Sequence, residues 1–411
     1  SGASQTGFGR TGTVDWQTTP KTATFTAVSG EGYFCNTSGG AFTVNLPAGS
    51  AGAIVSVADY TRTFQTNNLT VSPNGTEKLG GVNADAKLST EGQSVTFVYV
   101  DATEGWINVQ DSTSAVQGRL VTPFIIATVS GACNTLATSG DCKIATFTGP
   151  GTFCVTNEGT GSNQVVSHMV IAGGGGGGHD DGGGGGAGGF RENESPVTPY
   201  TQSPLAGGTA VTISSASAIP ITVGAGGVGG VPTVTCNATQ GSSSIFSTIT
   251  SAGGGLGGRG APTGGPGGSG GGGGEAVPGG TGNTPPVSPS QGNNGGTGGG
   301  ANASAGGGGA GAVGSNGISS PAGGGAGGAG VTTEINGSSV TRSGGGGGGG
   351  FNTPGAGGSG GGGSGGKYPS TQATAGTVNT GGGGGGGSTN TGPRDGKSGG
   401  SGIVIIRYKF Q

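Results

Sequence analysis

Long runs of glycine constrain this chain more than any other feature. It has 110 glycines in 411 residues, and 88 of them lie between Gly173 and Gly402, with unbroken runs at 344–350 and 381–387. A polyglycine run has no side chains to bury, and it loses more backbone freedom on ordering than any other sequence. Such a segment is either a disordered linker or part of a fold that its own backbone holds together. The varied apolar and polar inserts between the runs favour the ordered fold.

A bundle of polyglycine II helices is the ordered fold that we expect. A strand of the polyproline II type has three residues per turn, rises about 3.1 Å per residue and has no internal hydrogen bonds. Its backbone groups point outward in three directions, and only glycine lets such a strand be surrounded on all sides by others. A seven-residue run would be roughly 22 Å long. Collagen is excluded because the sequence has no sustained Gly-X-Y period.

The remainder of the chain has the pattern of a β protein. Short apolar runs separated by turn residues, such as AIVSVADY (53–60) and SVTFVYVD (94–101), are typical of strands. The chain ends with IVIIRYKF (403–410), an apolar strand that must be buried, and its expected partner is HMVIA (168–172) at the other end of the glycine region. No segment shows a 3.6-residue apolar period, so we predict an all-β fold with almost no α-helix.

These patterns divide the chain into five segments. We expect a connector over 1–18, an N-terminal β-sandwich-like module over 19–112, a linker over 113–123, a second small β-sheet over 124–172 that residues 403–411 complete, and a large polyglycine II bundle over 173–402 inserted between its strands. An apolar strand leads directly into glycine three times, at 168–178, 220–230 and 247–258. Strands and polyglycine II helices have similar backbone angles, so these three helices are predicted to leave the sheet in the same direction.

Several function classes are excluded by composition. Charged residues make up only 8% of the chain and the net charge is −3, which is unlike the basic surface of a nucleic-acid-binding protein. No run approaches 18 apolar residues, so no membrane insertion is expected. The five cysteines are far apart and are expected to be free, with a bridge between Cys133 and Cys142 as the alternative. Because the sequence starts at Ser1 without methionine, we expect a processed product or a fragment.

No motif predicts an enzyme, a cofactor or a metal site. The stretch TGPRDGKS (391–398) lacks the first glycine and the subsequent helix that a phosphate-binding loop requires. His179, Asp180 and Asp181 interrupt two glycine runs and have the side chains of cation ligands, but no further histidine or cysteine is near them in the sequence. We therefore interpret these three residues as a solvated turn.

Aromatic and charged inserts within the glycine region predict a contact surface. Counting the runs upward from the sheet, and backward from Ile403, places the inserts 190–204, 232–240, 275–291, 313–321, 351–354 and 388–395 at the end distant from the sheet, and 367–380 nearer to it. Exposed aromatic and arginine side chains on loops of a rigid scaffold are typical of binding sites. Loops that only close the bundle are the alternative. The candidate receptor-contact residues are Phe190, Arg191, Tyr200, Phe351, Asn352, Arg394 and Asp395.

Two groups of motifs resemble known phage proteins. GRTGTVDWQTTPKTATFTAVSGEGYFCNTSGGAFTVNLPAGSAGAIVSVADY (9–60) and TEGWINVQD (103–111) are similar to the β module of tail-fibre proteins of marine tailed phages, cyanophages especially. TFTGPGTFCVTN (146–157), MVIAGGGGGG, FSTITSAGGG and the closing GGSGIVIIRYKF resemble the glycine-rich tip domain of such fibres. Tip adhesins of some enterobacterial phages also use polyglycine II bundles. Here, unlike in those adhesins, β module and tip share one chain.

The resemblance implies a virion adhesin without catalytic residues. Its expected partners are a host cell-surface glycan or outer-membrane protein and other virion fibre or baseplate proteins. It would be assembled in the host cytoplasm and located in the virion, as a homotrimer or as a monomer. Two alternatives come from other classes: a structural or ice-binding glycine-rich protein, and an enzymatic tailspike, which usually needs a large parallel β-helix and a carboxylate cleft.

Overall fold

The computed structural model describes residues 14–112, 124–232, 238–260, 262–389 and 394–411. The chain divides into two compact units, Ser1–Leu120 and Val121–Gln411. The expected linker 113–123 lies outside the described residues. Nearly all regular structure in the described residues is β, and the helical element among them is one 3₁₀ turn, η1 (Gly161–Gln164). The predicted all-β class is therefore confirmed.

The N-terminal unit is a sandwich of two sheets. Its first sheet has the order β1-β3-β5-β8-β9, and its second has the order β2-β4-β6-β7. The strands are β1 (Asp15–Lys21), β2 (Phe25–Thr26), β3 (Glu31–Cys35), β4 (Phe42–Asn45), β5 (Ile54–Asp59), β6 (Leu69–Ser72), β7 (Ala86–Leu88), β8 (Ser94–Asp101) and β9 (Gly105–Ser112). Up to β6 the chain alternates between the sheets, and the pairs within each sheet are parallel. Because β1 begins at Asp15, part of the expected connector 1–18 belongs to this module.

The core of this module lies between the two sheets. Every second residue of β4 and β6 is buried, and so are Val55 and Val57 of β5 and Val95 and Phe97 of β8. This alternation is what a strand with one face in a core requires. Trp106, the largest fully buried side chain, closes the core beside Tyr99.

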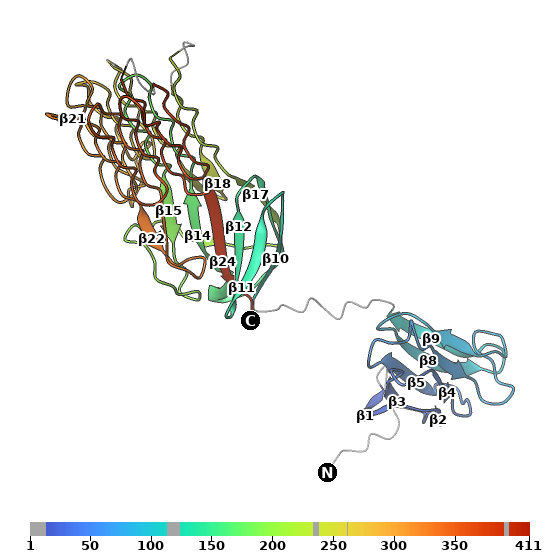
Figure 1. Cartoon of the computed structure of the whole chain (residues 1–411). Coiled ribbons are helices and arrows are strands. Elements are labelled where there is room, and N and C mark those ends of the chain that lie inside the picture. Colours follow the sequence, from blue (N-terminus) through green and yellow to red (C-terminus); the bar gives the residue numbers. More distant parts are fainter. Residues whose placement is uncertain (1–13, 113–123, 233–237, 261, 390–393) are drawn as a thin grey trace. The chain divides into compact units, whose positions relative to one another are not determined.

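The base of the second unit consists of two further sheets. One has the order β11-β12-β24-β14-β15, with β16 also paired to β14, and the other has the order β10-β13-β17-β18-β19. The strands are β10 (Ile125–Ser130), β11 (Thr135–Ser139), β12 (Cys142–Phe147), β13 (Gly151–Glu158), β14 (Val165–Ile171), β15 (Phe190–Asn193), β16 (Val211–Thr212), β17 (Ala218–Thr222), β18 (Ser244–Phe246), β19 (Ile249–Ser251) and β24 (Ile403–Lys409). Figure 1 shows β24 between β14 and β12. The predicted pairing of the closing strand with HMVIA is confirmed, since Met169 lies opposite Ile405 in an antiparallel ladder.

The base of this unit is larger than the sequence predicts. β15, β17, β18 and β19 come from the region 173–402, so the glycine-rich region supplies part of the base as well as the helices. The two sheets pack through Phe147, Phe153, Phe246 and Tyr408. On the other side of the β14–β24 pair, a hairpin of β22 (Val331–Thr333) and β23 (Val340–Arg342) packs on Ile171 and Ile403. A small hairpin, β20 (Ile318–Ser319) and β21 (Ala322–Gly323), completes the strands.

The glycine runs are helices held together by backbone hydrogen bonds. Within 173–178, the N–H groups of residues three apart donate to the same antiparallel neighbour, at donor–acceptor distances of 2.8–3.0 Å. The donors and their acceptor carbonyls are Gly173 and Gly176 to Ser242 and Thr239, Gly174 and Gly177 to Gly400 and Lys397, and Gly175 and Gly178 to Gly186 and Gly183. Their carbonyls accept, also at 2.8–3.0 Å, from Gly254 and Gly257, Gly227 and Gly230, and Gly384 and Gly387. This three-residue period is that of polyglycine II. Helix 173–178 is therefore surrounded by six neighbours, and all of its backbone groups are bonded.

The directions of these helices are given by the same hydrogen bonds. Gly173 and Gly176 accept from Gly254 and Gly257 of helix 252–258, and Gly174 and Gly177 accept from Gly227 and Gly230 of helix 223–230. In both pairs the residue numbers of donors and acceptors increase together, so these two helices run parallel to 173–178. The prediction that the three strand-to-glycine junctions leave the base in one direction is confirmed. In Figure 1 the bundle lies beyond one end of the sheet that contains β14 and β24. We name the two ends of this glycine bundle the sheet end and the far end.

His168 makes the second unit sensitive to acid. Its pKa is lowered from 6.5 to about 4, first by burial and then by the positive charge of Arg191. Its Nδ1 atom is buried without a hydrogen-bond partner, and its ring lies edge-on to Phe246. Unfolding lets this histidine take up a proton near its ordinary pKa. The stability that depends on neutral His168 is thus complete above pH 6.5 and is lost as the pH falls towards 4, by about 3 kcal/mol in total.

We expect the substitution His168→Leu to remove most of this acid-dependent loss. Urea unfolding of both proteins at about pH 7.5 and about pH 4.5 measures it. The raised pKa of Asp181, described below, shifts stability in the opposite direction, but it does so in both proteins and cancels from their difference. An equal loss of stability in wild type and variant contradicts the assignment.

Candidate functional site

Turns of many different sequences close the far end of the glycine bundle. The strand β14 leads into helix 173–178, and residues 179–181 form the first far-end turn, after which 182–189 returns to the base. Backbone contacts connect this turn to the others: Gly182 pairs with Arg259 and bonds Gly349 and Gly387, and Gly350 pairs with Ala303 and Lys367. The far-end turns are 179–181, the described parts of 231–238, 259–260, 275–276, 300–303, the β20–β21 hairpin, 351–354, 367–371 and the described parts of 388–395.

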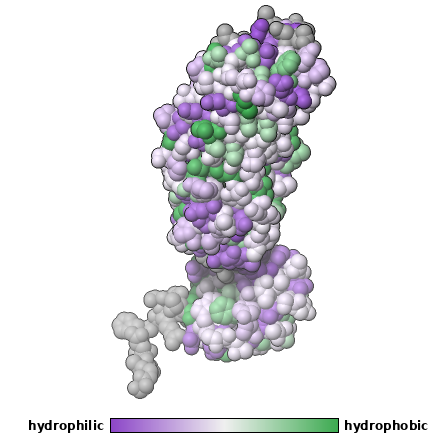
Figure 2. Space-filling model, turned by 60° about the vertical axis from the view of Figure 1, so that its left-hand side comes forward, coloured by the Kyte–Doolittle hydropathy of each residue, from purple (hydrophilic) through white to green (hydrophobic). Residues whose placement is uncertain are grey.

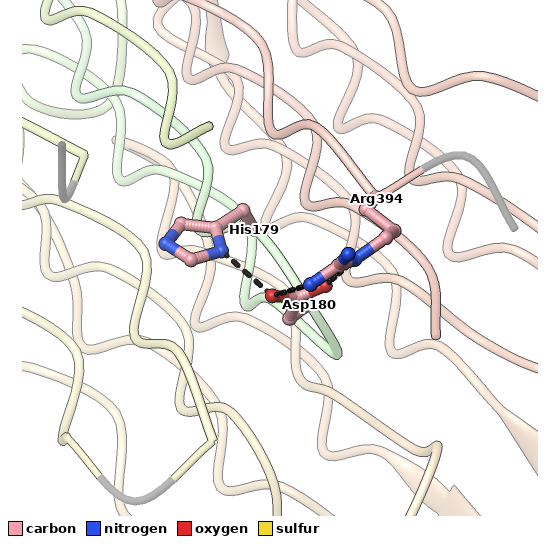
Figure 3. A network of polar contacts seen from close by, with 3 residues as sticks. All are labelled: His179, Asp180 and Arg394. Carbon is pink, nitrogen blue, oxygen red and sulfur yellow. Dashed lines mark hydrogen bonds and ion pairs between the residues drawn. The ribbon is translucent and has the colours of Figure 1, made fainter. Parts of the chain in front are cut away.

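Asp180 and Arg394 form an ion pair that connects two of these turns, and we call this ion pair the clip. Arg394 donates from Nε to Oδ1 of Asp180 and from Nη2 to Oδ2 at 2.7 Å, and the Asp180 N–H donates to the Arg394 carbonyl at 3.0 Å. His179 Nδ1 lies 3.1 Å from Asp180 Oδ2 (Figure 3). Burial raises the pKa of Asp180, but the hydrogen bonds from Arg394 and His179 outweigh it, so the pKa is lowered. Residues 179 and 394 are 215 positions apart, so the clip fixes the relative place of the first and last far-end turns.

The expectation that residues 179–181 form a solvated turn is wrong. His179 and Asp181 are 2% and 5% exposed, because helices pack around the turn on several sides. The Asp181 N–H donates to the Ser388 carbonyl, while Oδ1 has no hydrogen-bond partner. Burial raises the pKa of Asp181, and the neighbouring carboxylate of Glu275 raises it further. The turn is therefore a structural element of the far end.

A pair of aromatic residues, one exposed and one half-buried, lies on the same end. The rings of Phe351 and Tyr368 are stacked, with centroids 4.7 Å apart and planes 8° apart. Phe351 is 40% exposed. Phe351 comes directly after a glycine helix and Tyr368 comes two residues after one, and the Tyr368 N–H donates to the Gly350 carbonyl at 3.3 Å. Ser388 Oγ donates to the same Gly350 carbonyl, which places the aromatic pair beside the turn that contains Arg394.

Four of the seven predicted contact residues lie at the far end. Phe351 and Asn352 are in the exposed turn 351–354, and Arg394 and Asp395 begin the descent of 394–402. Residues 390–393 of the predicted insert 388–395 lie outside the described residues, as do 233–237 of the predicted insert 232–240. On the face that Figure 2 shows, the glycine-rich unit is largely pale, with small hydrophilic and hydrophobic patches between.

The other three predicted contact residues lie at the sheet end, so their expected distal position is wrong. Phe190 and Arg191 belong to β15 and pair with Ile171 and Val170 of β14, and Phe190 is 1% exposed. The Tyr200 hydroxyl donates to Glu192 at 3.0 Å beside the same sheet. The reason is the turn 179–181: the chain has already reversed there, and 182–189 is a descending helix.

The expected positions of two inserts are also wrong in part. Of 275–291, only 275–276 is at the far end, because Gln291 accepts from the Phe190 N–H and, through Oε1, from the Ala252 N–H at the sheet end. Of 367–380, the turn 367–371 is at the far end, and only the later residues reach the sheet end, where Thr380 accepts from the Ser343 N–H. The expectation for 313–321 holds for the β20–β21 hairpin, since Ser319 Oγ donates to the carbonyl of Gly299.

Sequence reasoning misses Tyr368 and Asp180 as far-end residues. The signal for Asp180 is present, since HDD is the only interruption between two long glycine runs in 173–186. A far-end cavity of about 110 Å³ is lined by Gly178, Ala238, Leu256, Gly257, Gly258, Arg259 and Pro262, and it is smaller than an ordinary ligand pocket. In the described part of the chain, no three His, Cys, Asp or Glu side chains are grouped as metal ligands.

The comparison with protein families identifies the larger unit. A family model described as a glycine-rich domain matches residues 146–409. The chain therefore belongs to the family of glycine-rich domain proteins. The match begins within β12 and ends with β24, so it includes the whole glycine bundle and the strands of both sheets except β10, β11 and the start of β12. Comparison with curated proteins gave no match. Over the described residues, no helix has the length and apolar character needed to cross a membrane.

Proposed function

We propose that this protein is a virion fibre adhesin that binds a bacterial surface receptor through the far-end turns. The observation that carries the proposal is the contrast between the interior and the end of the bundle. The interior is fixed by backbone hydrogen bonds that use no side chains, as in helix 173–178. The far-end turns differ in length and sequence and carry exposed aromatic, charged and amide side chains.

This division supports binding more than a purely structural role. A scaffold that does not depend on the sequences of its turns holds them in place while they vary, which is the usual arrangement of binding loops on a rigid framework. The resemblance of the β module to phage fibre proteins supports a position in a virion, with fibre or baseplate proteins as partners of the N-terminal unit. The proposal includes no enzymatic step. The proposal applies equally if the protein is a monomer or a homotrimer.

Replacing far-end turns should abolish adsorption to host cells and leave folding intact. The variant has turns 351–354 and 367–371 replaced by Gly-Ser sequences of the same length. Binding of the labelled full chain to a panel of bacterial strains that includes marine cyanobacteria is measured by flow cytometry. We expect at least a tenfold loss of bound protein on the strains that wild type binds, since contact residues at the centre of an interface cost about 2 kcal/mol or more.

The matched control replaces the sheet-end turn 311–313, which contains the exposed Val313, by Gly-Ser residues. Equal melting temperatures of both variants and wild type show that the bundle is intact. Adsorption that depends on 311–313 and not on the far-end turns contradicts the proposed orientation. Failure of wild type to bind any strain, together with inhibition of ice recrystallisation, favours the ice-binding alternative.

A further inference from the structure

We propose that the stacked pair Phe351–Tyr368 is a platform on which a sugar ring of the host surface binds. This inference rests on the proposed function and narrows the receptor class to carbohydrate. The two rings are parallel within 8°, and each lies within two residues of the end of a polyglycine II helix. Phe351 is 40% exposed and Tyr368 is half-buried, so part of the stacked pair is open to solvent.

The chemistry of this surface matches a pyranose ring. An aromatic face carries partial negative charge, and the axial C–H groups on one side of a sugar carry partial positive charge, so the two attract when they stack. The neighbouring exposed residues Asn352, Thr353, Ser370 and Thr371 bear amide and hydroxyl groups that can bond the equatorial hydroxyls of the sugar. The Asn352 side chain and the Tyr368 hydroxyl have no hydrogen-bond partner among the described residues. Lys367 adds a positive charge, which favours sugars that carry a carboxylate.

Backbone hydrogen bonds hold the turns that carry both rings in position before any ligand binds. Phe351 donates from its N–H to the Asn302 carbonyl, and Asn352 donates to the Ala322 carbonyl at 2.8 Å. On the other turn, Lys367 pairs with Gly350 and donates to the Thr371 carbonyl at 2.8 Å. Four different turns thus fix the platform, and little loop ordering remains to oppose binding.

A protein receptor fits this surface less well. A stable protein interface buries about 1,200–2,000 Å² around an apolar centre. The surroundings of the aromatic pair consist of glycine, serine, threonine and asparagine residues, and Phe351 is the only large hydrophobic residue that is exposed in the described part of 300–371, apart from Val313 at the sheet end and Ile318 in the β20–β21 hairpin. Two aromatic rings surrounded by polar side chains match the size and chemistry of one or two sugar units.

The test measures glycan binding by the full-length protein and its variants. The probe is an array of purified bacterial capsular polysaccharides and O-antigens. We expect wild type to bind a subset of these glycans, and Phe351→Ala and Tyr368→Ala each to weaken that binding at least tenfold. Phe351→Tyr, which keeps the flat ring, should retain it. Val313→Ala and Val378→Ala, exposed aliphatic residues at the sheet end, are matched controls that should bind as wild type does.

Treatment of the cells separates this inference from the proposed function. Periodate oxidation cleaves sugar rings with vicinal diols, and protease removes surface proteins. Adsorption that periodate abolishes and protease leaves intact supports the sugar platform. Adsorption that survives periodate but requires surface protein overturns the platform and leaves the adhesin proposal standing. The absence of binding to every array glycan, or equal binding by wild type and both alanine variants, also overturns it.

Discussion

The substitution Gly176→Ala should unfold the second unit under conditions in which wild type is stable. A Cβ atom at Gly176 would lie 2.0 Å from the carbonyl oxygen of Val228 and 2.5 Å from its carbon, and both are backbone atoms of a neighbouring helix. That helix cannot move away without breaking its own bonds to 173–178. Overpacking in a well-packed interior typically costs about 1–3 kcal/mol, and each of the two hydrogen bonds of Gly176 contributes about 1 kcal/mol.

Thermal and urea unfolding of the full chain measures this effect. The control is Val228→Ala, because Val228 occupies a glycine helix with its side chain 56% exposed. We expect that change to alter stability by less than about 0.5 kcal/mol. The N-terminal unit has its own core and provides an internal reference for folding. Similar unfolding of the two variants would show that helix 173–178 is not enclosed by its six neighbours.

Deletion of residues 403–411 should prevent folding of the whole glycine-rich unit. β24 pairs on both sides, with β12 and β14, and Val404, Ile406 and Tyr408 are at most 1% exposed. Burial of each such side chain contributes roughly 1.5–3 kcal/mol, and the sum over the strand is comparable with the stability of an ordinary domain, about 5–15 kcal/mol. The deletion also exposes the edges of β12 and β14, which favours aggregation.

Limited proteolysis checks this expectation. The truncated protein should lose residues 124–402 rapidly while the N-terminal unit stays resistant. Removal of Gln411 alone, which lies beyond β24 and is exposed, is the control and should change nothing. Persistence of a protease-resistant 124–402 fragment would show that the remaining strands suffice.

The sequence predicts the fold more fully than the site, because a glycine run shows that a helix forms but not in which direction it runs. The three-residue period and the junctions at 168–178, 220–230 and 247–258 can be inferred from composition and strand pattern, and the structure contains both. A glycine run, however, looks the same in either direction. Whether it ascends or descends depends on each preceding turn, and one unrecognised turn inverts the assignment of the inserts that follow it, up to the next strand from which the count starts again.

Phe190 and Arg191 illustrate this failure. The reversal at 179–181 needs only three residues, and nothing in the sequence distinguishes so short a turn from an irregularity within one helix. The assignment of Arg394 and Asp395 is correct because it counts backward from β24, across one uninterrupted descent. Tyr368 is missed because 367–380 contains a far-end turn and a descending helix, and no glycine run marks the boundary between them.

The hydrogen-bond period also governs how such chains can change length over evolution. Adding one residue within 173–178 would rotate the remainder of that helix by a third of a turn, so every later N–H would face the wrong neighbour. Insertions or deletions inside the runs are therefore tolerated in multiples of three, whereas the far-end turns can gain or lose any number of residues. Alignments of relatives of this protein should therefore show insertions and deletions of unrestricted size at the far-end turns, and of multiples of three residues within the glycine runs.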